Sequence, residues 1–157
     1  MTDLMDTMLG QALNRYRNLK EEYLWFKVFS DAQFREWVLD LIRQDQLFKQ
    51  GIDGDGDIIG YYSEYTEMLN PEKVAGTPFT LFDTGDFYKS FILYIYKDAI
   101  EVDANPIKIN DKGEKENLFW KYGENIIALT DESMVKLRQE FLQRFKSELK
   151  ELLHINK

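Results

Sequence analysis

Apolar residues recur at helical spacing in three stretches of the chain, two near its beginning and one at its end. Between residues 4 and 23 they occupy positions 5, 8, 9, 12, 13, 16, 19 and 23, a pattern typical of an amphipathic helix. The run 24–29 is almost wholly apolar, and it is either a buried turn of the same helix or a short strand.

The second stretch, residues 31–49, follows the i, i+3, i+4, i+7 spacing most clearly, and Ser30 with Gln33 forms a capping box before it. Gly51 stands where a left-handed residue commonly ends a helix. The third stretch follows Thr130, whose hydroxyl can accept from the free backbone N–H groups of a first turn. Its apolar stripe consists of Met134, Leu137, Phe141, Phe145, Leu149 and Leu152.

The middle of the chain has the composition of turns and short strands. Residues 87–96 are rich in aromatic and branched side chains, and residues 99–104 alternate with period two. With Lys97 and Asp98 between them as a two-residue turn, they predict a β-hairpin. The other elements expected there are turn chemistry at 53–57, a short strand at 58–62, loops at 71–78 and 105–116, and a short helix at 118–122 ending at Gly123.

This order of elements predicts an α+β fold, with long N-terminal helices, a small antiparallel sheet built around a central hairpin, and a long C-terminal helix. We expect one domain over residues 1–157, because no linker or repeat interrupts the chain. Its parts are a helical segment at 1–50, a β-containing core at 51–129 and the C-terminal helix at 130–155.

Charge and composition exclude several function classes. The 20 Lys and Arg residues against 28 Asp and Glu give a net charge of −8, whereas a protein that grips nucleic acid carries a basic face. We therefore expect no sequence-specific nucleic-acid partner. No apolar run reaches 18 residues, so no membrane span is expected. The start of the chain has two acids and no base, which argues against a signal peptide.

The residues that usually perform catalysis are scarce. With no cysteine, disulfides, thiolate zinc sites and a cysteine nucleophile are excluded. The single histidine, His154, is expected to be a solvated tail residue. No serine stands in a G-x-S-x-G elbow, and acidic pairs such as Asp83 and Asp86 arise by chance among 28 acids. We therefore expect no enzyme, no cofactor and no metal.

An acidic loop gives the alternative function. The ligand positions 1, 3, 5 and 12 of an EF-hand loop are occupied by Asp53, Asp55, Asp57 and Glu64. Position 6 is Ile58 where glycine is needed, position 8 is Gly60 where an apolar residue is needed, and Asn70 with Pro71 ends any following helix. A turn is the simpler interpretation, and a small calcium-binding or regulatory module stays open.

Residues 40–130 contain a series of motifs in a familiar order. The segment 45–53 is followed by Gly60-x-Tyr62-Ser63-x-x-Thr66, by a loop bearing Lys73 and Gly76, by the string 79–91 and by 122–130. The string contains a Leu-x-x-Thr-Gly-x-Phe-x-x-Ser core at 81–90. This order resembles small structural proteins of tailed phages and prophages, of the virion-morphogenesis or tail-completion type.

The resemblance implies a non-enzymatic subunit that joins a ring at the head–tail junction or in the tail. Its partners would be other phage structural proteins and copies of itself, in the host cytoplasm before assembly and in the virion afterwards. A ring requires two different contact faces on each subunit. If the ring borders a DNA channel, the negative charge of the protein would repel the phosphates of the DNA. Contact with packaged DNA would then be passive.

The motif at 81–91 also has a structural interpretation. We expect Gly85 to make a tight turn with positive φ, Asp83 and Thr84 to cap the backbone that follows, and two phenylalanines to anchor the segment. The residues concerned are Leu81, Asp83, Thr84, Gly85, Phe87, Ser90 and Phe91. The high aromatic content, 15% of the chain, indicates either a dense core or contact with partner subunits. The tyrosines at 61, 62 and 65 are assigned to core or protein-interface packing.

Overall fold

The computed structural model describes residues 8–109 and 113–154, and it confirms the predicted α+β class. The elements in chain order are α1 (Met8–Arg17), α2 (Glu21–Ser30), α3 (Ala32–Asp40), the π-helix η2 (Leu41–Phe48), α4 (Glu64–Leu69), α5 (Asp86–Lys89), β1 (Ile92–Ile95), β2 (Ile100–Asp103), β3 (Ile107–Ile109), β4 (Lys115–Asn117), α6 (Leu118–Tyr122), the 3-10 helix η3 (Glu124–Ile127) and α7 (Asp131–Leu152).

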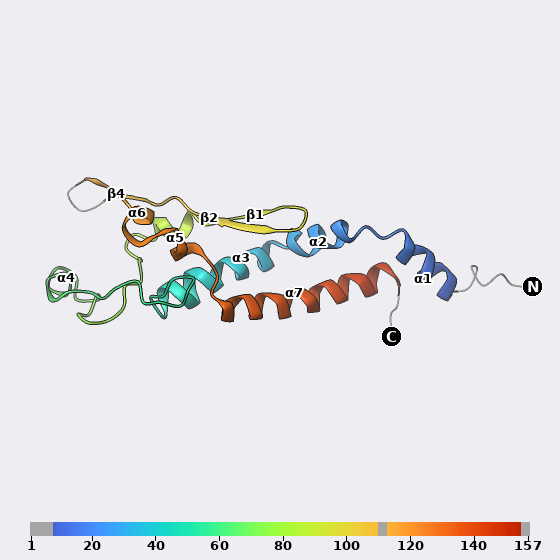
Figure 1. Cartoon of the computed structure of the whole chain (residues 1–157), viewed down its shortest axis with the longest axis horizontal. Helices are drawn as coiled ribbons and strands as arrows, with labels where there is room; N and C mark the ends of the chain where they lie inside the picture. The colour runs from blue at the N-terminus through green and yellow to red at the C-terminus, as the bar shows by residue number, and fades with distance from the viewer. Residues whose placement is uncertain (1–7, 110–112, 155–157) are drawn as a thin grey trace, which may run out of the picture.

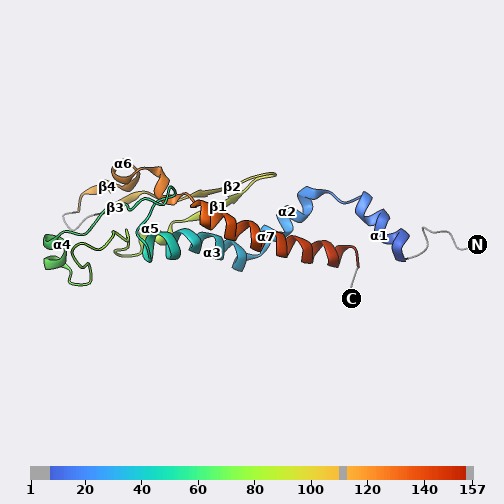
Figure 2. The ribbon, with the colours of Figure 1, turned by 60° about the horizontal axis from the view of Figure 1, so that its bottom comes forward.

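The molecule is a rod (Figure 1). Helix α7 runs antiparallel to the line formed by α2, α3 and η2, and the β1–β2 hairpin packs on α3. The views in Figures 1 and 2 agree that α4 lies at one end of the rod, near β3, β4 and α6, and that α1 lies at the other end.

The N-terminal helix is broken where the sequence predicts it to be continuous. Helix α1 ends at Arg17 and α2 begins at Glu21; the predicted start at residue 4 lies outside the described residues. At the break, the N–H of Asn18 is shared between the carbonyls of Asn14 and Arg15, a tightening typical of helix ends. The run 24–29 belongs to α2, so its helical alternative is the correct one.

The helix predicted over 31–49 is present as α3 followed by η2, but its cap is Asp31 rather than Ser30. The Asp31 carboxylate accepts from the N–H groups of Gln33 at 2.8 Å and Phe34 at 3.4 Å. The Ser30 hydroxyl instead donates to the Lys27 carbonyl and belongs to the end of α2. Gly51 has the left-handed φ of +65° expected after the helix.

The central hairpin is confirmed, with altered limits. Strands β1 and β2 are antiparallel, and the N–H of Tyr96 donates to the carbonyl of Ala99, which closes the turn at Lys97 and Asp98. Residues 86–89 form helix α5, so the first strand begins only at Ile92. The strand predicted at 58–62 is reduced to two isolated bridges, and the loop predicted at 105–116 contains a second hairpin, β3–β4.

The C-terminal part matches its prediction, because α6 ends before Gly123 and Thr130 caps α7 by accepting from the N–H of Ser133. Aromatic rings join α7 to α2: the ring of Phe141 lies 5.1 Å from that of Trp25 and 5.5 Å from that of Phe29. Within residues 8–109 and 113–154, no helix has both the length and the apolarity needed to cross a membrane.

A buried polar side chain, that of Gln46 in η2, joins the two helical layers where α7 begins. Gln46 is 1% exposed, and its amide donates to the carbonyl of Ala128 at 2.8 Å while accepting from the N–H of Thr130 at 3.0 Å. One side chain thus satisfies two backbone groups at the start of α7. No local pattern in the sequence marks this role, because the partners of Gln46 lie 82 and 84 positions away.

We predict that Gln46→Met lowers the free energy of unfolding by about 2 kcal/mol, because it leaves the Ala128 carbonyl and the Thr130 N–H without their partner at similar side-chain volume. Urea unfolding followed by circular dichroism measures the change. The matched control is Gln44→Met, at an exposed position two residues earlier, which we expect to change stability by less than about 0.5 kcal/mol. Equal effects of the two substitutions would contradict the assignment.

Candidate functional site

The segments 59–63 and 79–91, which carry most of the sequence resemblance, begin side by side. A bridge pairs Tyr61 with Pro78, and the N–H of Phe79 donates to the carbonyl of Gly60 at 2.8 Å. The N–H of Tyr62 donates to the carbonyl of Thr77 at 3.0 Å. The structure therefore joins the two motifs through backbone hydrogen bonds, at the end of the rod that carries α4.

Thr80 is the hydrogen-bonding centre of this junction. Its N–H donates to the Tyr62 hydroxyl at 3.2 Å, and its own hydroxyl lies 3.1 Å from the same oxygen. The Thr80 carbonyl accepts from the hydroxyl of Tyr88, and burial raises the pKa of Tyr88, which keeps this donor protonated. These bonds hold Leu81 at a φ of +54°, a strained value for a residue with a side chain.

Asp83 ties the motif to two other segments. Its carboxylate lies 2.8 Å from the Lys108 ammonium on β3 and 3.2 Å from the Lys73 ammonium in the loop after α4. The hydrogen bond from Lys108, aided by that from Lys73, holds the pKa of Asp83 below its ordinary value. The expected capping role of Asp83 is wrong, because its oxygens are used by these lysines. Sequence spacing contains no signal for either partner.

The remaining motif residues hold the segment against the core. Gly85 has a φ of +81°, the predicted positive value, and the hydroxyl of Thr84 accepts from the N–H of Asp86 at 3.3 Å. The buried rings of Phe87 and Phe91 lie 5.1 Å apart. The Ser90 hydroxyl donates to the Phe87 carbonyl and accepts from the N–H of Asn105. The segment is therefore fixed on several sides.

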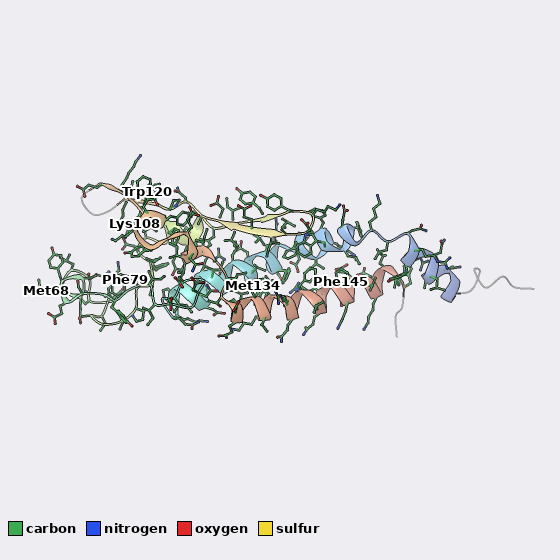
Figure 3. All side chains as sticks on the ribbon, viewed as in Figure 1. Met68, Phe79, Lys108, Trp120, Met134 and Phe145 are labelled. Atoms are coloured by element: carbon green, nitrogen blue, oxygen red, sulfur yellow. The ribbon has the colours of Figure 1, made fainter. Side chains whose placement is uncertain are left out.

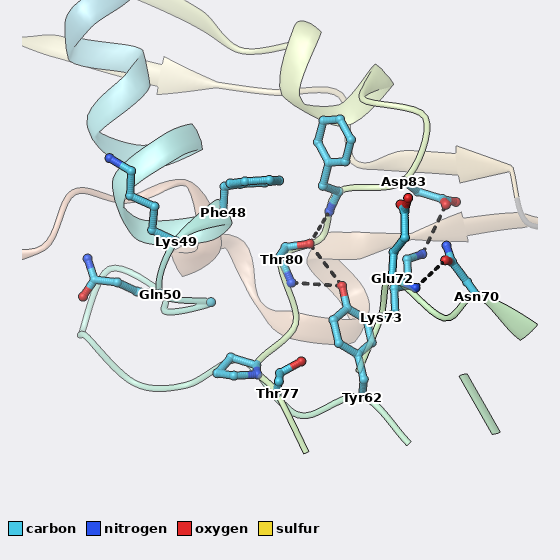
Figure 4. Close-up of a pocket in the computed structure, with 13 residues that line it drawn as sticks. Phe48, Lys49, Gln50, Tyr62, Asn70, Glu72, Lys73, Thr77, Thr80 and Asp83 are labelled. Carbon is cyan, nitrogen blue, oxygen red and sulfur yellow. Dashed lines mark hydrogen bonds and ion pairs between the residues drawn. The ribbon is translucent and has the colours of Figure 1, made fainter. Parts of the chain in front are cut away.

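A hollow of about 440 Å³ opens beside this junction (Figure 4). Phe48 and Lys49 lie on one side of it, and Lys73 with Asp83 on the other. The lining contains no histidine, cysteine or serine, and the hydroxyls of Tyr62 and Thr80 are engaged with each other. Lys49 is paired with Asp45 at 2.6 Å, and Lys73 with Asp83. Most of the hollow's polar groups therefore already have partners.

The acidic loop does not gather its four candidate ligands. The Asp53 carboxylate accepts from the N–H groups of Asp55 and Asp57, both at 3.0 Å, and Asp55 accepts from the Asn125 amide at 2.7 Å. Glu64 begins α4 and is exposed. In the part of the chain that the structure describes, no group of three or more His, Cys, Asp or Glu residues is placed to hold a metal ion. The loop instead docks on η3.

Large apolar side chains remain exposed over much of the rod. Some aromatic residues form the core, so the dense-core interpretation holds in part, but ten are exposed: Tyr16, Tyr23, Phe26, Phe48, Tyr61, Tyr65, Phe82, Tyr94, Tyr96 and Trp120. Figure 3 places Met68 at one end of the rod and Trp120 beside the second hairpin. Trp120 is 90% exposed. Aromatic side chains are enriched at surfaces that bind other proteins.

Comparison with known proteins identifies no relative: no family model, no curated protein and no solved structure matches the chain. The site is therefore interpreted from its own geometry.

We predict that Asp83→Asn lowers the free energy of unfolding at pH 7 by about 0.5–1 kcal/mol, a small value because the carboxylate is partly exposed and screened. Because folding lowers the pKa of Asp83, its contribution is present above the pKa of an unfolded aspartate, about 3.9, and is lost as the pH falls through the lowered folded value. Urea unfolding at a series of pH values from 7 to about 2.5 tests this. The control is Asp57→Asn, at an exposed carboxylate. A difference between wild type and Asp83→Asn that persists undiminished at the acid end would contradict it.

We also predict that isothermal titration with calcium chloride gives no stoichiometric heat, because Asp53 and Asp55 already accept hydrogen bonds and the described residues contain no group of three acids placed to hold a metal ion. A stoichiometric heat that disappears in Asp55→Ala would favour the calcium-binding module instead.

Proposed function

We propose that the chain is a non-enzymatic structural subunit of a tailed-phage virion, a tail-completion or head–tail adaptor protein that assembles into a ring. It would be present in the host cytoplasm before assembly and in the virion afterwards. The observation that carries the proposal is the exposed apolar surface: ten large aromatic side chains lie on the outside of a folded rod.

The exposed residues stand on ordered, hydrogen-bonded elements, which supports contact surfaces rather than frayed ends. Ile92 and Tyr94 are exposed on β1, which is paired along its length with β2. The side-chain N–H of Trp25 donates to the carbonyl of Tyr96 at 2.7 Å, which fixes the hairpin turn on α2. A rigid surface binds with a smaller loss of conformational entropy than a mobile one.

The motif that suggests the family also has a use in this proposal. Its residues hold the β3–β4 hairpin, the loop after α4 and the segment around Tyr62 in one arrangement, through Asp83 and Thr80. Partner proteins would therefore meet fixed surfaces at that end of the rod. A passive contact with packaged DNA stays a prediction from the net charge of −8.

The proposal is tested by mass spectrometry of purified particles from cells that carry the gene and a phage or prophage capable of completing its cycle. We expect the chain to co-purify with the coat proteins in a fixed copy number, and deletion of its gene to yield heads and tails that fail to form complete particles. Complementation with the wild-type chain is the control. Complete, infectious particles that lack the chain would contradict the proposal.

A further inference from the structure

Helix α4 directs its apolar residues to solvent. Tyr65, Met68 and Leu69 follow the i, i+3, i+4 spacing that normally marks a buried face, yet they are 67%, 78% and 65% exposed. Tyr61, one turn earlier in the sequence, is also exposed. We call these four residues the tip face.

The tip face is held in place by the rest of the chain. The Ser63 hydroxyl caps α4 by accepting from the N–H of Thr66, and the Glu67 carboxylate accepts from the N–H of Ala75 at 2.9 Å. The N–H of Gly76 donates to the Tyr62 carbonyl at 2.9 Å. These bonds fix α4 to the loop that follows it, so its apolar residues form a defined surface.

The opposite end of the rod also exposes large apolar side chains. Leu13 and Tyr16 on α1 and Tyr23 on α2 are exposed, and we call these three residues the base face. No described side chain of α1 belongs to the buried hydrophobic core. Figures 1 and 2 both place α1 and α4 at opposite ends of the molecule.

The two ends carry opposite charge. Residues 8–23, which carry the base face, contain three bases, Arg15, Arg17 and Lys20, and two acids, Glu21 and Glu22. Glu22 is paired with Lys97 at 2.7 Å. Residues 61–72 contain three acids and no base, namely Glu64, Glu67 and Glu72. In residues 8–109 and 113–154, the three bases of the base end (Arg15, Arg17 and Lys20) and the three acids of the tip end form no salt bridge. The base end therefore has a net positive charge beside its exposed apolar residues, and the tip end has a net negative charge beside its own.

On the basis of the structural role proposed above, we propose that the tip face of one copy docks on the base face of the next copy. Opposite charges favour this pairing, whereas tip on tip or base on base would place like charges together. A contact between two different faces repeats from copy to copy, and it closes into a ring or continues as a filament. A second copy is thus the occupant that the charges of both ends fit.

The contact is expected to be weak in isolation. Each face contains a few side chains, less than the roughly 800 Å² per partner of a standard stable interface. The association is therefore expected only at high protein concentration, and it is expected to weaken as salt screens the charges. Neighbouring components of a particle would add further contacts.

Sedimentation velocity of the full chain over a range of concentrations tests the proposal. We expect the wild type to form species larger than a dimer at high concentration, with an apparent dissociation constant that rises at least about tenfold when salt is increased tenfold. Met68→Asp at the tip face and Tyr16→Asp at the base face should each remain monomeric. Leu142→Asp, at an exposed position in the middle of α7, is the matched control and should associate like the wild type.

Mixing supplies the sharpest result. Met68→Asp blocks the tip face and keeps the base face, whereas Tyr16→Asp blocks the base face and keeps the tip face. A mixture of these two blocked variants should therefore form a 1:1 dimer that does not grow. Circular dichroism of both variants verifies that they are folded. A wild type that stays monomeric at every concentration, a blocked variant that still assembles, or a mixture that stays monomeric would overturn the proposal.

These outcomes are separable from those of the particle test. A chain that is found in particles but does not associate through its ends would retain the proposed function and lose this contact. A chain that associates end to end but is absent from particles would keep the contact and lose the function.

Discussion

The antiparallel seam between α7 and the line of α2, α3 and η2 determines the shape of the molecule. Polar contacts hold the two sides together along its whole length. Lys27 pairs with Glu148 at one end, and Arg144 pairs with Asp31 at 2.7 Å in the middle. At the other end, the Gln46 side chain accepts a hydrogen bond from the N–H of Thr130. Aromatic rings fill the space between these polar contacts. Because the seam is long and only two helices wide, the hairpins and α4 are added at its side and its end, and much of their apolar surface finds no cover within one copy.

The exposed apolar surface and the anchored motif are two parts of one arrangement. The bonds around Thr80 and Asp83 fix the loops that present Tyr61, Tyr65 and Met68 to solvent. The strained φ of Leu81 is held in the same way. A protein that acts by contact needs surfaces of fixed shape more than it needs activated side chains. The proposed role as a virion subunit follows this logic, and so does the docking of one end on the other.

Local signals in the sequence predict the elements whose cause is local. The periodic apolar stripes and the Thr130 cap identify the long helices, and Lys97 with Asp98 identifies the hairpin turn, because both depend on neighbours within a few residues. The contacts of the candidate site depend on distant partners. Asp83 meets Lys108 across 25 positions and Gln46 meets Thr130 across 84, and no pattern along one chain marks such pairs. The sequence assigns Tyr61 and Tyr65 to core or protein-interface packing and leaves that choice open, because an apolar pattern cannot distinguish a core from an interface. Both side chains are exposed in a single copy.

The central claim is that the outward apolar residues are contact surfaces for other subunits. Hydroxyl-radical footprinting of the free chain and of assembled particles, read residue by residue in a mass spectrometer, tests it most directly. The account predicts that Tyr65, Met68 and Trp120 are oxidised readily in the free chain and strongly protected after assembly. Equal oxidation of these three side chains in both states would contradict it.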